Sequence, residues 1–247
     1  YTTSTLPGLG TPFSVYGSFK PDSSKIAYGL GIYTPFGSSI GYDEDWKGNA
    51  VLQSMSLATI FFQPTISYQV SDKVGIGIGY VFGLGSFELK KAVPALDGSG
   101  EYGQGTLSGK ANGHSFNFGI YFTPSDKLSI GLSYRHGITV KEEDGTASFV
   151  VPSSLEEYFP STTFSASLPM PGTMSLGLGY QVNEKLKLAV DYSHVTWSVY
   201  DTLAFDFADN TDKLDDIASA RMYRNTSIFR LGAEYQLNEK FRFRAGA

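Results

Sequence analysis

Apolar and polar side chains alternate along several segments of this chain. Between 74 and 84 the even positions carry valine, isoleucine, tyrosine, phenylalanine and leucine, whereas the odd positions are glycine except at Val81. A similar alternation occurs at 26–36, 128–135 and 174–182. Because successive side chains of a β-strand point to opposite faces, this pattern predicts strands with one apolar face and one face of small or polar residues.

Short polar turns ending in lysine recur at intervals of about 50 residues. They lie at 23–25, 71–73, 125–127, 183–185 and 238–240. Each turn separates two alternating segments, which predicts a tight hairpin. Longer polar segments, expected to be returning loops, lie at 37–55, 90–112, 141–170 and 206–226. Short turns at one edge and long loops at the other are typical of outer-membrane β-barrels.

The non-apolar face of the predicted strands carries glycine, serine and a few charges. These charges are Arg135, Lys187, Asp191, Arg230, Glu234, Arg242 and Arg244. An arginine or lysine facing lipid near the bilayer midplane would cost about 2–4 kcal/mol, so this face is expected to line a lumen. The simplest role for the charges is to pair with one another and brace the wall. Tyrosines near strand ends, such as Tyr80, Tyr134 and Tyr192, suit the membrane–water interface, although β-propensity alone also favours them.

Composition narrows the function classes. The 247 residues include 15% aromatic and 17% charged residues, no cysteine, and a net charge of -5. No run of about 18 apolar residues exists, so we expect no transmembrane helix, and a closed barrel is the other structure that can span a bilayer. The negative charge disfavours nucleic acid as a partner. The missing cysteines exclude thiol catalysis and cysteine-bound metals.

Enzymatic and metal chemistry has little support in the residues. The three histidines, His114, His136 and His194, are far apart in sequence and accompany no metal-ligand spacing or nucleophile motif. The aspartates between 209 and 216 miss the spacing of a calcium-binding EF-hand loop, so a solvated acidic loop is the simpler interpretation. We therefore expect no cofactor, no metal and no catalytic residue.

The predicted fold is all-β, an antiparallel up-and-down transmembrane β-barrel in a single domain, 1–247, incomplete at both ends. Ten strands are expected. They cover 13–19, 26–36, 56–70, 74–89, 113–123, 128–140, 173–182, 186–205, 226–237 and 241–247. Alternatives left open are a general diffusion porin, an outer-membrane barrel enzyme, and a soluble β-sandwich or lipocalin-like binder. Clustering of Ile76, Ile78, Ile130, Leu132 and Leu176 in a water-soluble core would contradict the barrel.

Several segments resemble the outer-membrane long-chain fatty-acid transporter family of the FadL/TodX type. The resemblance rests on the order and spacing of the segments at 29–37, 42–48, 63–79, 168–180, 191–198 and 229–246. It implies a barrel of about 14 strands in the Gram-negative outer membrane, whose lumen an N-terminal hatch plugs. Against that pattern the chain lacks the hatch, the first strand and about three final strands. We therefore expect a fragment that does not form a working pore alone, because a truncated edge leaves unpaired backbone in lipid.

The resemblance also implies a function, namely uptake of long-chain fatty acids or other hydrophobic molecules by a monomer in contact with outer-membrane lipid and lipopolysaccharide. Ligand-binding candidates are Lys90, Lys91, Arg221 and Arg224 for a carboxylate and Val151, Leu155, Tyr158, Phe159 and Phe164 for an apolar groove. Gly29, Gly31 and Pro35 fall where the family carries a kinked strand beside a lateral gate. Solvated loop charges, loop-on-loop contacts and packing against a hatch are the simpler roles for these three groups.

Overall fold

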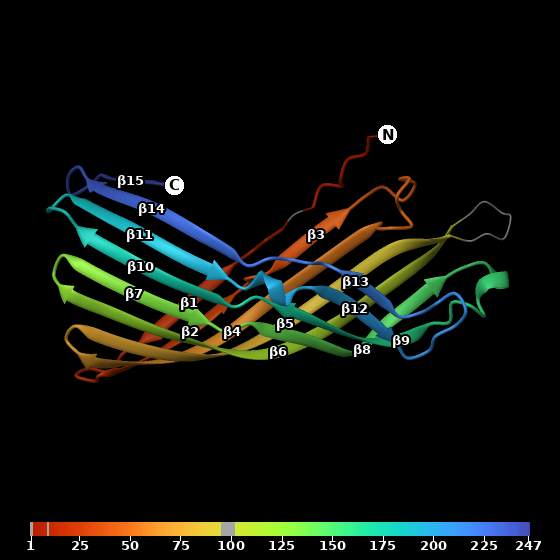
Figure 1. Ribbon diagram of the computed structural model, residues 1–247, viewed down its shortest axis with the longest axis horizontal. Coiled ribbons are helices and arrows are strands. Elements are labelled where there is room, and N and C mark those ends of the chain that lie inside the picture. Colours follow the sequence, from red (N-terminus) through yellow and green to blue (C-terminus); the bar gives the residue numbers. More distant parts are fainter. Residues whose placement is uncertain (1, 9, 95–101) are drawn as a thin grey trace.

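The computed structural model describes residues 2–8, 10–94 and 102–247, and their strands form one antiparallel 15-stranded sheet (Figure 1). Ten strands pair in the order β1-β2-β4-β5-β6-β7-β10-β11-β14-β15. Their bounds are β1 Ser14–Phe19, β2 Ile26–Tyr33, β4 Ser54–Ser71, β5 Val74–Pro94, β6 Tyr102–Ser125, β7 Leu128–Arg135, β10 Thr173–Gln181, β11 Leu186–Val195, β14 Thr226–Gln236 and β15 Arg242–Gly246. Along this path β1 and β15 are the two edges, so the sheet is open between them. No helix of the described residues is long and apolar enough to cross a bilayer.

The remaining strands extend the sheet at the loop end. They are β3 Gly37–Gly41, β8 Ile138–Val150, β9 Thr162–Met170, β12 Thr202–Phe207 and β13 Ile217–Ala220. The first half of β6 pairs with β8, β8 with β9, β9 with β12, and β12 with β13, while β3 pairs with β4. Two short 3-10 turns, η1 (Ser153–Leu155) and η2 (Trp197–Val199), also lie at this end.

The prediction of long polar loops was wrong in one respect. Much of the segments 37–55, 90–112, 141–170 and 206–226 is β-strand, because their backbone groups pair across β5, β6, β8, β9 and β12. The predicted strands 128–140 and 186–205 are each interrupted, at 136–137 and at 196–201. Residues 95–101 of the predicted loop 90–112 are outside the described residues. The ten predicted strands otherwise agree with the ten-strand path to within a few residues at most ends.

Two hairpin turns at the other end are held by polar residues noted in the sequence. Asn183 accepts hydrogen bonds from the amides of Lys185 and Leu186 through its Oδ1, at 2.9 and 3.0 Å. Asn238 makes the same two bonds with Lys240 and Phe241. An asparagine side chain that replaces a backbone acceptor in this way stabilises a tight turn.

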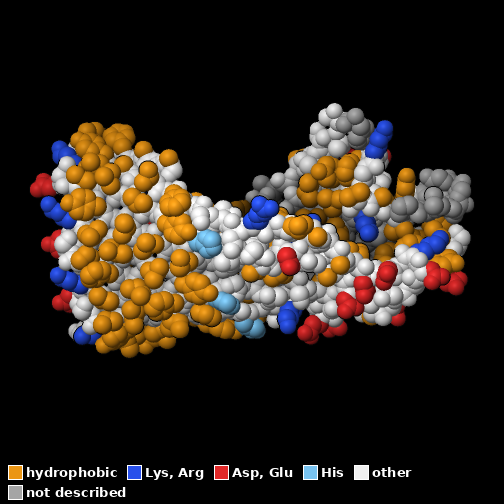
Figure 2. Space-filling model, viewed as in Figure 1, with side chains coloured by type: hydrophobic (Ala, Val, Ile, Leu, Met, Phe, Trp, Pro, Cys, Tyr) orange, Lys and Arg blue, Asp and Glu red, His pale blue; other side chains and the backbone are white. Residues whose placement is uncertain are grey.

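The two faces of the ten-strand sheet differ as the alternation predicts. Four side chains named as decisive are exposed: Ile76 (37%), Ile78 (59%), Leu132 (36%) and Leu176 (41%). They belong to a broad band of apolar side chains that lies between the charged hairpin turns and the loop end (Figure 2). Such a band is what a lipid-facing wall requires, and a water-soluble protein rarely exposes one so large.

Candidate ligand cavity on the inner face of the loop end

The inner face, opposite the apolar band, holds two clusters of buried apolar residues. The first cluster lies at the loop end and contains Leu107, Ala147, Phe164, Phe205, Phe207 and Leu214. The second contains Phe61, Val81, Ile138, Val140 and Met170 and lies where the loop-end strands meet the ten-strand sheet. Together they line one side of the sheet with apolar surface over its loop-end half.

A cavity of about 360 Å³ lies beside the first cluster. Its walls come from β5, β6, β8 and β12 and from residues 213–217, which precede and begin β13. Most of the lining is aliphatic or aromatic, including Leu89, Leu107, Phe149 and Phe207. The charged members are Lys91, Lys213 and Asp215. A volume of this size, with mostly apolar walls and a few polar groups, is typical of small-ligand sites.

Strand alternation separates the two candidate lysines of β5. Lys91 lies on the same face as Leu89 and lines the cavity. Lys90 points to the opposite face, where its Nζ lies 3.1 Å from Oε1 of Glu88. The period of two in a strand therefore places one lysine at the cavity and the other outside it.

The apolar residues predicted from the segment 141–170 divide into three groups. Phe159 lines the cavity and packs against Phe149, with ring centroids 5.6 Å apart. Tyr158 lies next to it, and the Lys213 ammonium is 4.7 Å from the centroid of its ring. Phe164 is only 1% exposed and contacts the rings of Phe87, Phe205 and Phe207 in the first cluster. Leu155 is buried, and Val151 lies close to the backbone of Gly103.

A chain of aromatic rings crosses the inner face below the cavity. Tyr33 contacts Phe61 at 5.8 Å between centroids, Phe61 contacts Phe36 at 6.2 Å, and Phe36 contacts Trp197 at 6.1 Å. Trp197 in η2 follows β11, which is far from β2 in the strand order, so this contact bridges the two sides of the curved sheet. Arg135 lies over the ring of Phe36, 5.8 Å from its centroid.

Arg221 and Arg224 do not line the cavity. Both are exposed in the connection between β13 and β14. The backbone amides of Arg221 and Met222 donate to the carbonyl of Asp201, and Met222 has a φ of 53°, which is unusual for a residue with a side chain. Tyr223 between the two arginines contacts Trp197, so this connection touches the end of the aromatic chain.

Of the three predicted gate residues, Pro35 lies at a break between two strands, whereas Gly29 and Gly31 do not. Gly29 and Gly31 lie within β2 and are in register with Thr65 and Gln63 of β4, so neither interrupts the pairing. The break is the segment 34–36 between β2 and β3, which contains Pro35. Proline has no amide hydrogen to donate to a ladder, which accounts for the interruption.

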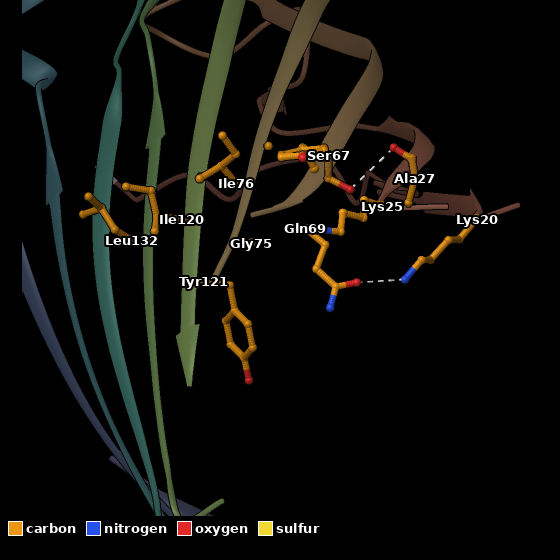
Figure 3. Close-up of a pocket in the computed structure, with 13 residues that line it drawn as sticks. Lys20, Lys25, Ala27, Ser67, Gln69, Gly75, Ile76, Ile120, Tyr121 and Leu132 are labelled. Carbon is orange, nitrogen blue, oxygen red and sulfur yellow. Dashed lines mark hydrogen bonds between the residues drawn. The ribbon is translucent and has the colours of Figure 1, made fainter. Parts of the chain in front are cut away.

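A second cavity, of about 400 Å³, lies at the hairpin-turn end (Figure 3). Its lining includes Lys20, Gln69 and Tyr121, and Lys20 donates a hydrogen bond to the side-chain oxygen of Gln69 at 3.1 Å. The floor is the backbone of glycines such as Gly75, around which an added Cβ would meet nothing within 4 Å. It is an open, partly polar depression, so it suits an apolar ligand less well than the loop-end cavity.

Charges on the inner face pair with one another near the last hairpin, as the sequence predicts. Glu234 accepts from Nε of Arg244 at 2.6 Å and lies 3.4 Å from Nε of Arg242. Arg230 donates to the hydroxyl of Ser193 at 3.3 Å. In the described ranges 2–8, 10–94 and 102–247, no group of three or more His, Asp or Glu side chains could hold a metal ion.

Sequence reasoning missed four residues of this region: Phe149, Trp197, Lys213 and Leu214. The aspartates between 209 and 216 predict a solvated acidic loop, yet Lys213 and Leu214 within this segment line the cavity. The sequence signal for this contact is Leu214, an apolar residue among aspartates. No local pattern marks Trp197, because its partner Phe36 is about 160 residues away and the contact depends on sheet curvature.

An open antiparallel sheet with an exposed apolar band outside and an apolar cavity inside defines the wall of an outer-membrane β-barrel. Comparison with known proteins then gives the family. A family described as outer membrane protein transport protein (OMPP1/FadL/TodX) matches residues 13–247, and the chain belongs to it. This membership places the chain in the Gram-negative outer membrane, in a family described as transport proteins.

Individual relatives agree with this assignment. The chain is 24% identical over 272 residues to outer membrane protein P1 of Haemophilus influenzae, covering 98% of this chain and 57% of that protein. The structure of a Pseudomonas aeruginosa FadL homologue matches with a TM-score of 0.81 at 20% identity, over 94% of this chain and 58% of the other. The Ralstonia pickettii toluene transporter TbuX matches with a TM-score of 0.71 at 19% identity, over 94% of this chain and 67% of the other. The chain thus spans a little over half the length of the curated relative.

Proposed function

We propose that this chain forms the part of an outer-membrane channel that captures a hydrophobic carboxylic acid, such as a long-chain fatty acid, at the cell surface. The observation that carries the proposal is Lys91, a cation at the wall of an otherwise mostly apolar cavity at the loop end. Burial of an acyl chain contributes about 0.8 kcal/mol per methylene, whereas an incompletely desolvated ion pair contributes about 0–1 kcal/mol. The apolar walls would therefore supply most of the affinity, and Lys91 would orient the carboxylate.

The inner surface supports a sideways exit rather than passage along the whole lumen. The cavity lies beside the first apolar cluster, which includes Phe164, and the second cluster, around Phe61, lies closer to the hairpin turns on the same face. Beyond this cluster, toward the hairpin turns, the inner face changes to small residues such as Ser67, Gly77 and Gly119. The break at 34–36 lies beside Phe61, where the apolar lining ends, so an apolar ligand would leave the lumen there and enter the membrane.

A second candidate ligand is a neutral aromatic hydrocarbon. Two proteins whose structures match this fold, TbuX and TodX, are described as toluene transporters. In this chain, the rings of Phe36, Phe61 and Trp197 offer edges and faces on which an aromatic ligand could pack. A neutral ligand would not need Lys91, so charge separates the two candidates.

The test compares Lys91→Met with Lys90→Met in the complete gene product that contains these strands. If the proposal is correct, Lys91→Met weakens binding of a long-chain fatty acid about tenfold, because one partly buried charge-assisted hydrogen bond is lost. Lys90→Met changes it little, because Lys90 points away from the cavity and pairs with Glu88. Binding is measured by titration of a fluorescent fatty acid in detergent.

Toluene and the methyl ester of the same fatty acid serve as uncharged ligands. Their binding should not respond to Lys91→Met. Equal fatty-acid affinity of the two lysine variants would contradict a carboxylate contact at Lys91. Saturable binding of toluene alone would favour the aromatic hydrocarbon, and ion conductance without saturable binding of any of these ligands would favour a general porin.

A further inference from the structure

All three histidines of the chain lie on the outer face, at the loop-end edge of the apolar band. Figure 2 shows their rings along the border where the exposed hydrophobic surface gives way to polar side chains. They come from three different places, His114 in β6, His136 after β7 and His194 in β11. The sheet therefore brings together residues that are widely separated in sequence.

Each histidine uses the same ring nitrogen for a hydroxyl partner. Nδ1 of His114 contacts the hydroxyl of Tyr80, and Nδ1 of His136 lies 2.9 Å from the hydroxyl of Tyr134. Nδ1 of His194 lies 3.2 Å from the hydroxyl of Ser227. Among the described residues, no Nε2 atom of the three has a hydrogen-bond partner.

This arrangement specifies what the remaining nitrogen can bind. When a hydroxyl donates to Nδ1, a neutral imidazole carries its hydrogen on Nε2, and Nε2 is then a donor. A neighbouring acceptor selects this form of the ring. When the hydroxyl donates at all three rings, the histidines present three outward donors along one row.

Aromatic neighbours hold two of the rings in place. His136 stacks on Phe116 with centroids 5.1 Å apart and an angle of 7° between the planes. His114 lies between the rings of Tyr80 and Phe82, at 5.9 and 5.3 Å. A ring that is already held in place loses less rotational freedom when it binds a partner, so the entropy cost of binding is lower.

The depth of the row matches the headgroup layer. Strand β10, which lies between His136 and His194 in the sheet, has nine residues. Nine residues span about 30 Å along a strand and about 23 Å of membrane depth at a tilt of about 40°, close to the apolar band of about 25 Å in outer-membrane barrels. Met174, near the start of β10, pairs with His194, so the histidines meet the point where hydrocarbon ends.

Cations lie further out on the same side. Lys110 is four residues before His114 on the same face of β6, and Lys141 of β8 pairs with Asn112. Both lysines are exposed. On the face shown in Figure 2, acidic side chains at this end lie further from the apolar band than the histidines.

We propose that the row of His114, His136 and His194 binds the phosphate groups of outer-leaflet lipids. The long-loop end of an outer-membrane barrel faces outward, so the lipid available at this border is the phosphorylated glycolipid of the outer leaflet. Phosphate oxygens are acceptors and match the three Nε2 donors and the lysines beyond them. Binding at this row would set the depth at which the barrel wall sits in the bilayer. The row lies on the outer face and takes no part in the ligand cavity.

The experiment measures binding of lipopolysaccharide, and of the same lipopolysaccharide after enzymatic dephosphorylation, to the complete gene product in detergent. The wild type should prefer the phosphorylated form about tenfold, the expected sum of several modest hydrogen bonds. The triple variant H114F/H136F/H194F keeps the aromatic surface and removes the donors, so it should lose this preference. H114Q/H136Q/H194Q keeps N–H donors and should recover part of it.

Three results would overturn the proposal. The first is a wild type that binds both lipid forms equally, and the second is a triple phenylalanine variant that keeps the preference. The third is displacement of the lipid by millimolar inorganic phosphate, which would indicate a site for the free ion. Circular dichroism verifies the strand content, and the single variant H136F replaces the triple variant if the latter does not fold. Tyr180→Phe, at the hairpin-turn end of the band, is the matched control and should change nothing.

Discussion

At the residue scale, buried or half-buried hydroxyl groups form hydrogen bonds with the backbone where strands are interrupted. Thr59 donates to the carbonyl of Phe36 at 2.6 Å and accepts from the amide of Phe36 at 3.2 Å. Ser115 donates to the carbonyls of His136 and Gly137, and Thr196 bonds both backbone groups of Gly172. Each hydroxyl supplies hydrogen bonds that a neighbouring strand would otherwise make, which matters because unpaired backbone groups are costly in a membrane.

Replacing Thr59 by valine tests this role. The substitution keeps the side-chain shape but removes both hydrogen bonds to Phe36, so the complete protein should lose about 1–2 kcal/mol of unfolding free energy. Urea unfolding in lipid vesicles measures the change. Thr65→Val is the control, because its hydroxyl accepts only a long 3.5 Å bond from Gln63. Equal stability of the two variants would show that the hydroxyl of Thr59 is dispensable at the break.

At the element scale, the loop-end strands continue the strands of the barrel wall after short interruptions. β8 follows β7 after two residues, and β10 follows β9 after two residues. The two interruptions lie side by side, because an added Cβ on Gly172 would meet the amide nitrogen of Gly137 and the carbonyl oxygen of Arg135, both at 2.9 Å. The glycines therefore permit a close backbone approach that redirects both strands at the same height.

Gly172→Ala should disturb this close approach. The new methyl group contacts backbone atoms rather than a movable side chain, so we expect a loss of about 1–3 kcal/mol, as for other overpacked sites. Gly131→Ala in β7 is the matched control, since nothing lies within 4 Å of an added Cβ there. Thermal or urea unfolding of both variants measures the difference. A Gly172→Ala protein as stable as Gly131→Ala would contradict the steric argument.

At the scale of the whole molecule, one sheet separates two environments. Its outer face carries the apolar band, and its inner face changes from apolar at the loop end to small and polar at the turn end. The band and the cavity lie on opposite faces of the same strands, so residues only one position apart, such as Lys90 and Lys91, serve different environments.

A lysine in the apolar band should hinder insertion of the whole protein. Ile78 is 59% exposed between the hairpin turns and the histidine row, so Ile78→Lys is expected to cost about 2–4 kcal/mol in a bilayer. Val51→Lys is the control, because Val51 is 81% exposed in the connection between β3 and β4, outside the band. The folded fraction in lipid vesicles across a urea series measures both. Similar folding of the two variants would contradict a lipid-facing Ile78.

Local pattern was sufficient for the barrel wall and insufficient for the loop end. In a membrane, strands with one glycine face and one apolar face, as at Val74–Leu84, are compatible with a β-barrel wall. Their predicted positions agree with the structure. Residues 138–150 and 162–170 lack so regular an alternation, and a bulge between Glu142 and Gly145 shifts their register. Their pairing with each other and with β6 could not be predicted, because it depends on long-range backbone contacts.

By itself, the sequence determined the two faces of the sheet, the hairpin turns and the membrane environment, because these follow from side-chain period and turn chemistry over neighbouring residues. The tertiary structure alone decided that Lys91 rather than Lys90 meets the cavity, that Trp197 reaches Phe36, and that three distant histidines form one row. Those relations depend on the register and curvature of pairings between segments far apart in the chain, which no local pattern encodes.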